Sequence, residues 1–258
     1  MTPYEQFKAE GKAEIAALGE DERFRQLSRD WMDAANHARY SYHFEWLGRP
    51  IIQYPQDIVA LSELIFAVKP DLVIETGIAH GGSLMLTASM LLLLDFMEGP
   101  SVGETVSFAS KRRVMGIDID IRAHNRQAIE AHPLSFMIEL VQGSSIDQNV
   151  IARARTAAEG ARKVMVVLDS NHTHDHVLEE LRGYADLVSP GSYCVVFDTV
   201  IEDMPAEMFH DRPWGKGNSP KSAIWEFLTQ TDSFEIDKEI ENKLGPTVGP
   251  DGFLRRVR

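Results

Sequence analysis

The stretch VIETGIAHGGSL (residues 73–84) continues a run of aliphatic side chains and then combines one acidic residue with three glycines. Glycines in such a segment allow a tight turn from a strand into a helix and let a ligand lie against the backbone. The spacing is neither the G-x-G-x-x-G of dinucleotide-binding folds nor the G-K-[ST] of a phosphate-binding loop. Because Glu75 would repel a phosphate, the pattern favours a ligand with a cationic end. Glycines that serve only the turn are the alternative.

Short aliphatic runs alternate with helical segments beyond this turn. The predicted strands are residues 71–76, 112–118, 136–142, 163–169 and 192–198, with weaker ones at 234–237 and 253–257. The predicted helices between and after them are residues 82–95, 121–131, 146–158, 175–188 and 219–230. The central strands are apolar at consecutive positions, so both faces of the sheet should be covered, as in parallel sheets. The alternation predicts a doubly wound, Rossmann-like α/β sheet.

Two further segments stand apart from this pattern. Residues 1–50 are charged, aromatic-rich and largely helical in pattern, which predicts an N-terminal extension ahead of a sheet domain over residues 51–258. Asp57 is a candidate N-cap for a helix over residues 58–68. Residues 199–220 read as a long loop, and loops of that length often act as lids or binding loops.

Composition restricts the classes of function. The 258 residues carry 26 Lys and Arg against 39 Asp and Glu, a formal net charge of −13, which argues against nucleic acid or anionic membranes as partners. No stretch approaches the roughly 18 consecutive apolar residues that a membrane span needs. The single cysteine, Cys194, lies in an apolar run and cannot form an internal disulfide. It is expected to be a core thiol, in keeping with a cytoplasmic location.

The ends of the predicted strands carry polar residues, and ligands of open α/β sheets bind beyond these ends. Asp118 ends the second strand and could accept hydrogen bonds from both hydroxyls of a ribose, while Asp120 is the better candidate for an N-cap. Ser145 follows the third strand and could contact an adenine. A capping role for Ser145 or Asp147 is the alternative.

The fourth and fifth strands end in Asp169 and Asp198, which should lie side by side. Two carboxylates at this edge are hard oxygen ligands suited to Mg²⁺, and helix capping is their structural alternative. Magnesium could hold a substrate hydroxyl and lower its pKa, and His172 or His174 could then act as the base. Zinc is disfavoured, because H-x-H-x-H matches no common zinc pattern, and His176 is expected to be structural.

The motifs IETGIAHGGSLMLTASML, GIDIDIRAHNRQAIEAHP, VLDSNHTHDHVLEEL, YCVVFDTVIEDMP and RPWGKGNSP, in this order, resemble the cephalosporin hydroxylase / rhamnosyl O-methyltransferase family. The similarity runs from YPQDI to DGFLRR. It implies a class I S-adenosylmethionine-dependent methyltransferase fold with a seven-stranded sheet. It also implies a metal site like that of catechol-type O-methyltransferases and a homo-oligomeric enzyme.

The resemblance also implies roles for single residues. The methionine part of the cofactor would be lined by five residues of the first turn: Glu75, Gly77, Gly81, Gly82 and Ser83. Asp118 would take the ribose and Ser145 the adenine side. Asp169, which also borders the cofactor, and Asp198 would hold the metal.

The resemblance does not decide which residue is the third metal ligand or which is the base. Thr199 stands where catechol-type enzymes have a ligating asparagine, and Glu202, Asp203 or water are alternatives. His174 best matches the position of the catechol-type catalytic lysine, followed by His172.

Together with the carboxylates at the strand ends, the resemblance implies a Mg²⁺-assisted O-methyltransferase that acts on a hydroxyl of a sugar, glycolipid or natural product. Trp214 in the long loop and Trp46 could form a platform for a sugar, with packing as the alternative for Trp46. Another nucleotide-dependent chemistry on the same fold, such as an NAD-linked reaction, is the enzymatic alternative. An accessory or scaffold protein that binds the cofactor without turnover is the non-enzymatic one.

Overall fold

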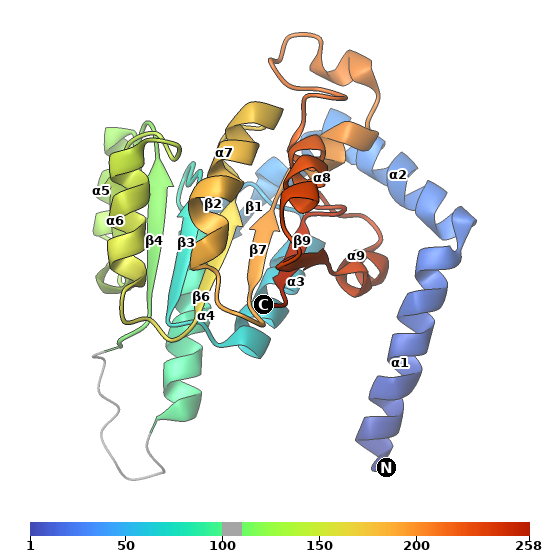
Figure 1. Ribbon diagram of the computed structural model, residues 1–258, viewed down its shortest axis with the longest axis horizontal. Coiled ribbons are helices and arrows are strands. Elements are labelled where there is room, and N and C mark those ends of the chain that lie inside the picture. Colours follow the sequence, from blue (N-terminus) through green and yellow to red (C-terminus); the bar gives the residue numbers. More distant parts are fainter. Residues whose placement is uncertain (100–109) are drawn as a thin grey trace.

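A mixed sheet of seven strands forms the centre of the computed structural model, which describes residues 1–99 and 110–258 (Figure 1). The strand order is β5-β4-β3-β6-β7-β9-β8. The first five strands in this order are mutually parallel, whereas β9 runs antiparallel to β7 and β8 antiparallel to β9. The bounds are β3 Leu72–Thr76, β4 Arg113–Asp118, β5 Ile138–Gln142, β6 Val164–Leu168, β7 Tyr193–Val196, β8 Phe234–Ile236 and β9 Phe253–Arg256. All seven predicted strands are confirmed, with ends shifted by one or two residues.

Helices cover both faces of the sheet, as the consecutive apolar residues of the strands require. Along β6, Met165 and Val167 point into the core shared with α3 and α4, while Val164, Val166 and Leu168 point into the core shared with α6, α7 and α8. The bounds are α3 Pro55–Val68, α4 Gly82–Glu98, α5 Ala123–Glu130, α6 Gln148–Ala158, α7 His174–Tyr184, α8 Pro220–Gln230 and α9 Lys238–Leu244. The predicted doubly wound sheet is therefore confirmed.

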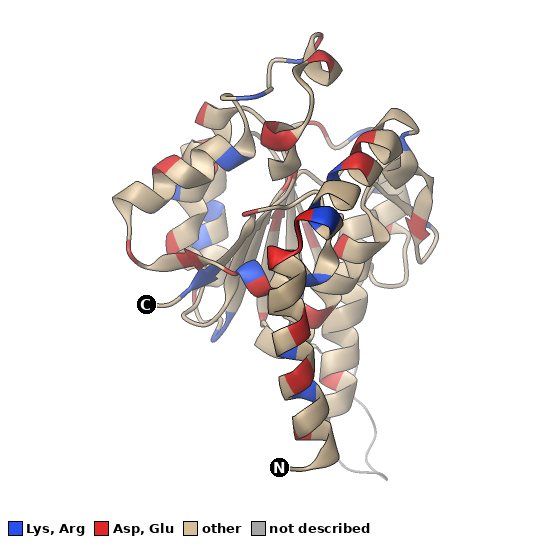
Figure 2. Ribbon diagram, turned by 90° about the vertical axis from the view of Figure 1, so that its right-hand side faces the viewer, with Lys and Arg blue, Asp and Glu red and all other residues tan. Residues whose placement is uncertain are grey.

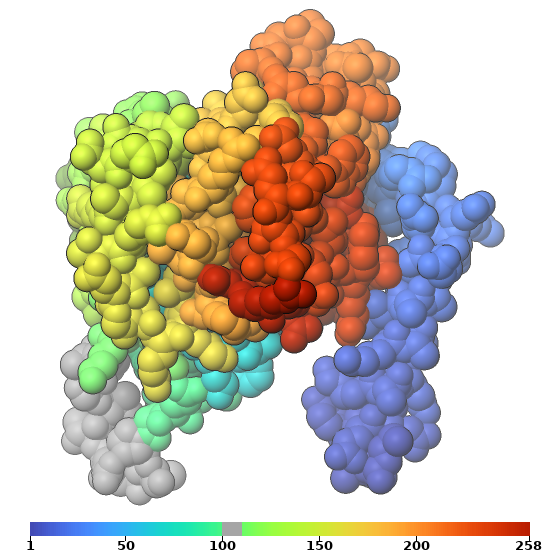
Figure 3. Space-filling view, in the orientation of Figure 1, coloured from blue at the N-terminus to red at the C-terminus, as the bar shows by residue number. Residues whose placement is uncertain are grey.

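The N-terminal segment begins with two helices, α1 (Pro3–Glu20) and α2 (Glu22–His37). α1 contacts α9 but buries none of its own residues, and Figure 3 shows its N-terminal part standing clear of the rest of the molecule. By contrast, α2 places Met32 and Ala35 in the core. In the view of Figure 2, acidic and basic residues are interspersed along the N-terminal helices. Within residues 1–99 and 110–258 no helix combines the length and the apolarity needed to cross a membrane.

Some local predictions were wrong. The segment after residue 43 forms a short antiparallel hairpin, β1 (Phe44–Trp46) with β2 (Arg49–Ile51), instead of helix. Asp57 is not an N-cap, because α3 already begins at Pro55 and the Asp57 side chain is buried inside the protein. Asp120 does not cap α5 either, since the residue at the N-cap is Arg122. Cys194 is buried, as predicted.

Candidate active site

The carboxyl ends of β3, β4, β6 and β7 bring the predicted site residues to one edge of the sheet. The turn from β3 into α4 forms the first part of this edge. Gly77 and Gly81 have φ values of +80° and +86°, which favour glycine. A Cβ on Gly77 would collide with the backbone carbonyl of Asp169, so the two strand ends can meet only because this residue lacks a side chain. Gly82 meets the backbone of Pro50 in the same way.

Glu75 lies beneath this turn and is only 2% exposed. The Thr87 hydroxyl donates a hydrogen bond to its Oε1. Burial raises the Glu75 pKa to about 7, although hydrogen bonds from Thr87 and Ser83 act in the opposite direction. A cationic group next to Glu75 would favour its ionised form, which is consistent with the ligand expected from the sequence.

Asp118 sits at the end of β4 with both oxygens directed to neighbouring backbone. Oδ2 accepts from the Ile78 amide at 3.0 Å and Oδ1 from the Asp120 amide at 3.0 Å. These bonds orient the carboxylate beside the β3–α4 turn, and each oxygen keeps a further lone pair for a ligand.

Ser145 is buried and belongs to a polar cluster that also joins the end of β6 to α7. Its hydroxyl lies 3.0 Å from His176 Nε2 and 3.4 Å from the Ser170 hydroxyl. Ser170 in turn donates to the fully buried Glu180 at 2.7 Å. Burial raises the pKa of Glu180 and lowers that of His176. Asp147, not Ser145, caps α6 by accepting from the Asn149 amide.

Asp169, His172 and Asp198 form the one group of potential metal ligands found in the described residues, with ligand atoms all within 4.8 Å of one another. His172 Nε2 lies 3.3 Å from Asp198 Oδ2. Asp198 has a left-handed backbone conformation (φ +55°), which turns its side chain at the very start of the loop that follows β7. Desolvation and the charge of Asp198 raise the pKa of Asp169. The two carboxylates fit a divalent cation, which would compensate their mutual repulsion, and the His172 ring lies beside them.

His174 and Thr199 are directed away from this cluster. The His174 ring lies 2.8 Å from the Ser222 hydroxyl and 3.1 Å from Glu226 Oε2, so both of its nitrogens face α8. The buried Thr199 hydroxyl donates to the Pro250 carbonyl at 2.6 Å. Neither side chain is available to a cation between Asp169 and Asp198 in this arrangement.

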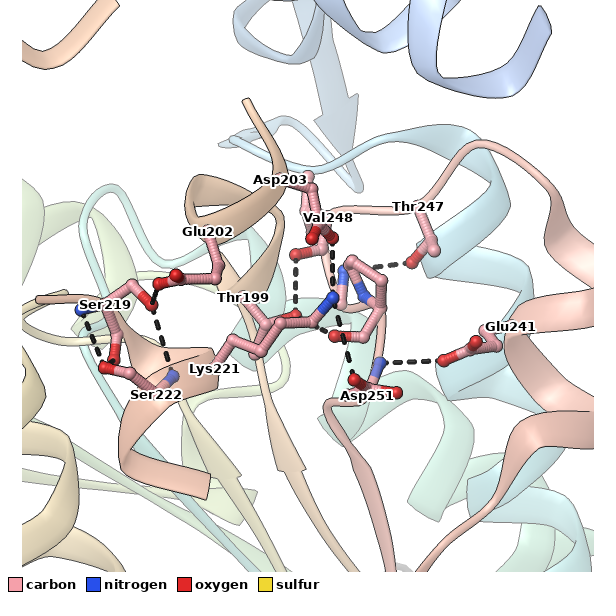
Figure 4. A network of polar contacts seen from close by, with 12 residues as sticks. Thr199, Glu202, Asp203, Ser219, Lys221, Ser222, Glu241, Thr247, Val248 and Asp251 are labelled. Carbon is pink, nitrogen blue, oxygen red and sulfur yellow. Dashed lines mark hydrogen bonds and ion pairs between the residues drawn. The ribbon is translucent and has the colours of Figure 1, made fainter. Parts of the chain in front are cut away.

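The alternative third ligands, Glu202 and Asp203, belong to a different polar network (Figure 4). Glu202 accepts from the Gly217 amide and the Ser219 hydroxyl, and Lys221 lies 2.6 Å from Asp203 and 3.6 Å from Asp251. These contacts connect the start of the loop to its end. Glu202 and Asp203 are therefore clamped to residues 217–221, while the loop between these two segments projects from the molecule (Figure 1).

Two side chains near the cluster differ in role. Trp214, from the projecting loop, packs edge-on against the His172 ring, with centroids 4.8 Å apart and an interplanar angle of 88°. Trp46 instead donates to the Ser89 hydroxyl at 3.0 Å and packs against the core, as its structural alternative predicted.

Sequence reasoning missed Gln53, whose amide donates to Asp169 Oδ2 at 3.1 Å. A lone glutamine before a helix carries no pattern that would have revealed it.

Known proteins resemble this chain in sequence and in fold. Residues 38–257 match the family described as "Rhamnosyl O-methyltransferase/CmcI". The chain belongs to that family. Its membership confirms the predicted resemblance, the methyltransferase fold and the enzyme class, an S-adenosylmethionine-dependent O-methyltransferase.

Individual relatives of this family member are distant. The rhamnosyl O-methyltransferase of Mycobacterium tuberculosis (strain ATCC 25618 / H37Rv) is 29% identical over 78% of this chain and 73% of its own length. The Mycobacterium leprae (strain TN) enzyme is 25% identical over 82% of each chain. An apo structure of CmcI has a TM-score of 0.55 at 17% identity, covering 84% of this chain and 77% of its own. A CmcI structure with Mg and SAM has a TM-score of 0.53 at 18% identity, over 84% and 78% of the two chains.

Proposed function

We propose that this methyltransferase transfers the methyl group to a hydroxyl of a sugar or a sugar-bearing natural product, with Mg²⁺ held by Asp169 and Asp198. The observation that carries the proposal is the cluster of Asp169, His172 and Asp198 beside the β3–α4 turn. The names of the mycobacterial relatives, which act on rhamnosyl groups, support the choice of acceptor.

When bound, S-adenosylmethionine would supply the methyl group, and Mg²⁺ would lower the pKa of the acceptor hydroxyl. The chain's own residues would fix the two reactants. Glu75 and the β3–α4 turn would face the methionine end, Asp118 the ribose and Ser145 the adenine side. Holding the reactants in line removes much of the entropic cost of their encounter.

We assign the base to His172. His174 is the weaker candidate because both of its nitrogens already face partners on α8. His172 is half-buried, lies within 3.3 Å of Asp198 and is held in place by the Trp214 ring. After His172 takes the hydroxyl proton, the nearby Asp198 would stabilise the resulting imidazolium.

Trp214 would contribute to the acceptor site. Its position on the projecting loop leaves it partly exposed beside His172, and Arg212 lies over its ring at 5.5 Å. Aromatic faces suit the apolar C–H faces of a sugar ring, as well as the edge of an imidazole.

The direct test incubates the protein with methyl-labelled S-adenosylmethionine and a panel of rhamnosides and other glycosides, with Mg²⁺ or with EDTA. We expect label in at least one glycoside, dependent on Mg²⁺ and lost in Asp198→Asn. Transfer that is unaffected by EDTA would contradict the metal role. Transfer only to non-sugar hydroxyls, such as catechols, would contradict the acceptor class while leaving the enzyme class intact.

A further inference from the structure

Gln53 lies between the proposed metal ligand Asp169 and the β3–α4 turn. It follows β2, precedes α3 and is only 7% exposed. Its Nε2 donates to Asp169 Oδ2 at 3.1 Å. Its Oε1 is buried and lacks a hydrogen-bond partner among the residues that the structure describes. A buried amide with an unused acceptor is costly unless a ligand or a water molecule completes it.

The surroundings fix the orientation of this amide. Gln53, Asp57, Glu75 and Asp169 all line one small cavity of about 10 Å³, which Gly77 and Ser83 of the β3–α4 turn also line. When Asp169 is ionised, as metal binding requires, the reverse amide orientation would place Oε1 against the Asp169 oxygen. The cavity has room for about one water molecule, which could donate to Oε1. Gln53 therefore donates to the carboxylate and accepts on its cavity side.

We propose that Gln53 is a positioning residue for the metal centre: it fixes the rotation of the Asp169 carboxylate so that this group can share a cation with Asp198. The proposal rests on the metal site proposed above. An amide suits this task because its N–H group holds one carboxylate oxygen without adding charge. Partners of this kind, one step behind the ligands, orient the ligands and raise metal affinity. Gln53 also contacts the cavity beside Glu75, so it lies between the metal ligands and the cofactor turn.

The test measures the affinity of Mn²⁺ alone for the metal-stripped full-length protein by electron paramagnetic resonance. Gln53→Met keeps the length of the side chain and removes its amide, whereas Gln53→Asn keeps an amide that is too short to reach Asp169. Both variants should weaken Mn²⁺ binding by about tenfold, the lower end of the range for such residues. Gln56→Met is the matched control, since Gln56 lies three residues further along and does not line the cavity. It should bind Mn²⁺ as the wild type does.

Circular dichroism and melting temperature show whether each variant folds. If Gln53→Met does not fold, the Mn²⁺ affinity of Gln53→Asn decides the test. Folded variants of Gln53 that bind Mn²⁺ within twofold of the wild type would overturn the proposal. Asp198→Asn separates this result from failure of the metal site itself. If Asp198→Asn binds Mn²⁺ as well as the wild type, or if the wild type binds none, the proposed metal centre is wrong and the role of Gln53 falls with it.

Discussion

Asp57→Asn should change how the stability of the protein depends on pH. Asp57 is 1% exposed and accepts hydrogen bonds from the Thr247 hydroxyl and, at 3.1 Å, from the Val248 amide. Burial raises its pKa from 3.8 to about 7. In the unfolded chain the carboxyl ionises near 3.8, so between these values the folded protein holds a proton that the unfolded chain has released.

The sign and size of the effect follow from this difference. Stability falls as the pH rises from about 4 to about 7, and it is constant above the folded pKa. Each pKa unit corresponds to about 1.4 kcal/mol, so the full penalty is about 4 kcal/mol and the part between pH 5 and pH 7.5 is about 3 kcal/mol. Glu75, with a pKa also raised to about 7, acts in the same direction but is present in both proteins.

The assay is urea unfolding of wild type and Asp57→Asn at pH 5 and pH 7.5 in EDTA. Whatever the difference in stability at pH 5, the variant should gain about 3 kcal/mol relative to the wild type on going to pH 7.5. Asp71→Asn is the control, because the hydrogen bonds of Asp71 to Arg162 and Lys163 lower its pKa, which places its titration below this window. Parallel pH profiles for wild type and Asp57→Asn would show that folding does not raise the Asp57 pKa.

Three further predictions concern the turn, the base and the loop. Gly77→Ala should lower the free energy of unfolding by about 3 kcal/mol, because it combines a left-handed φ with a collision against the end of β6; an unchanged urea midpoint would count against this. His172→Gln should lower kcat by about 100-fold while Mn²⁺ affinity is kept, whereas His174→Gln should change kcat only a few-fold. Equal losses in steady-state assays would exclude His172 as the specific base. Lys221→Met should cost about 2 kcal/mol in urea unfolding, since it leaves the Asp251 carboxylate without one of its cations; full stability would show that the clamp at the loop base adds little.

Periodicity was sufficient to predict the sheet. Each central strand is apolar at consecutive positions and each is followed by turn residues, so the strands and the edge where Asp169 and Asp198 meet could be anticipated. The hairpin at Phe44–Trp46 and Arg49–Ile51 could not, because strands of three residues are too short to show alternation. The division of the chain at residue 50 stays a prediction.

Side-chain directions were harder to predict than strand ends. His172 and His174 are two residues apart and equally plausible by chemistry, yet α7 begins at His174 and turns that ring towards α8. Thr199 follows Asp198 directly, but the left-handed conformation at Asp198 sends the next side chain into the 247–251 segment. Asp57 looked like a cap because it directly precedes the predicted helix. Its actual partners, Thr247 and Val248, are about 190 residues away in sequence. Such long-range contacts leave no local pattern.

The measurement that tests the central claim most directly is calorimetric titration of S-adenosylmethionine and then Mg²⁺ into the metal-stripped protein, for wild type and Asp198→Asn. We expect micromolar cofactor binding by both proteins and Mg²⁺ binding by the wild type alone. Absence of cofactor binding to the wild type, with or without Mg²⁺, would contradict this expectation.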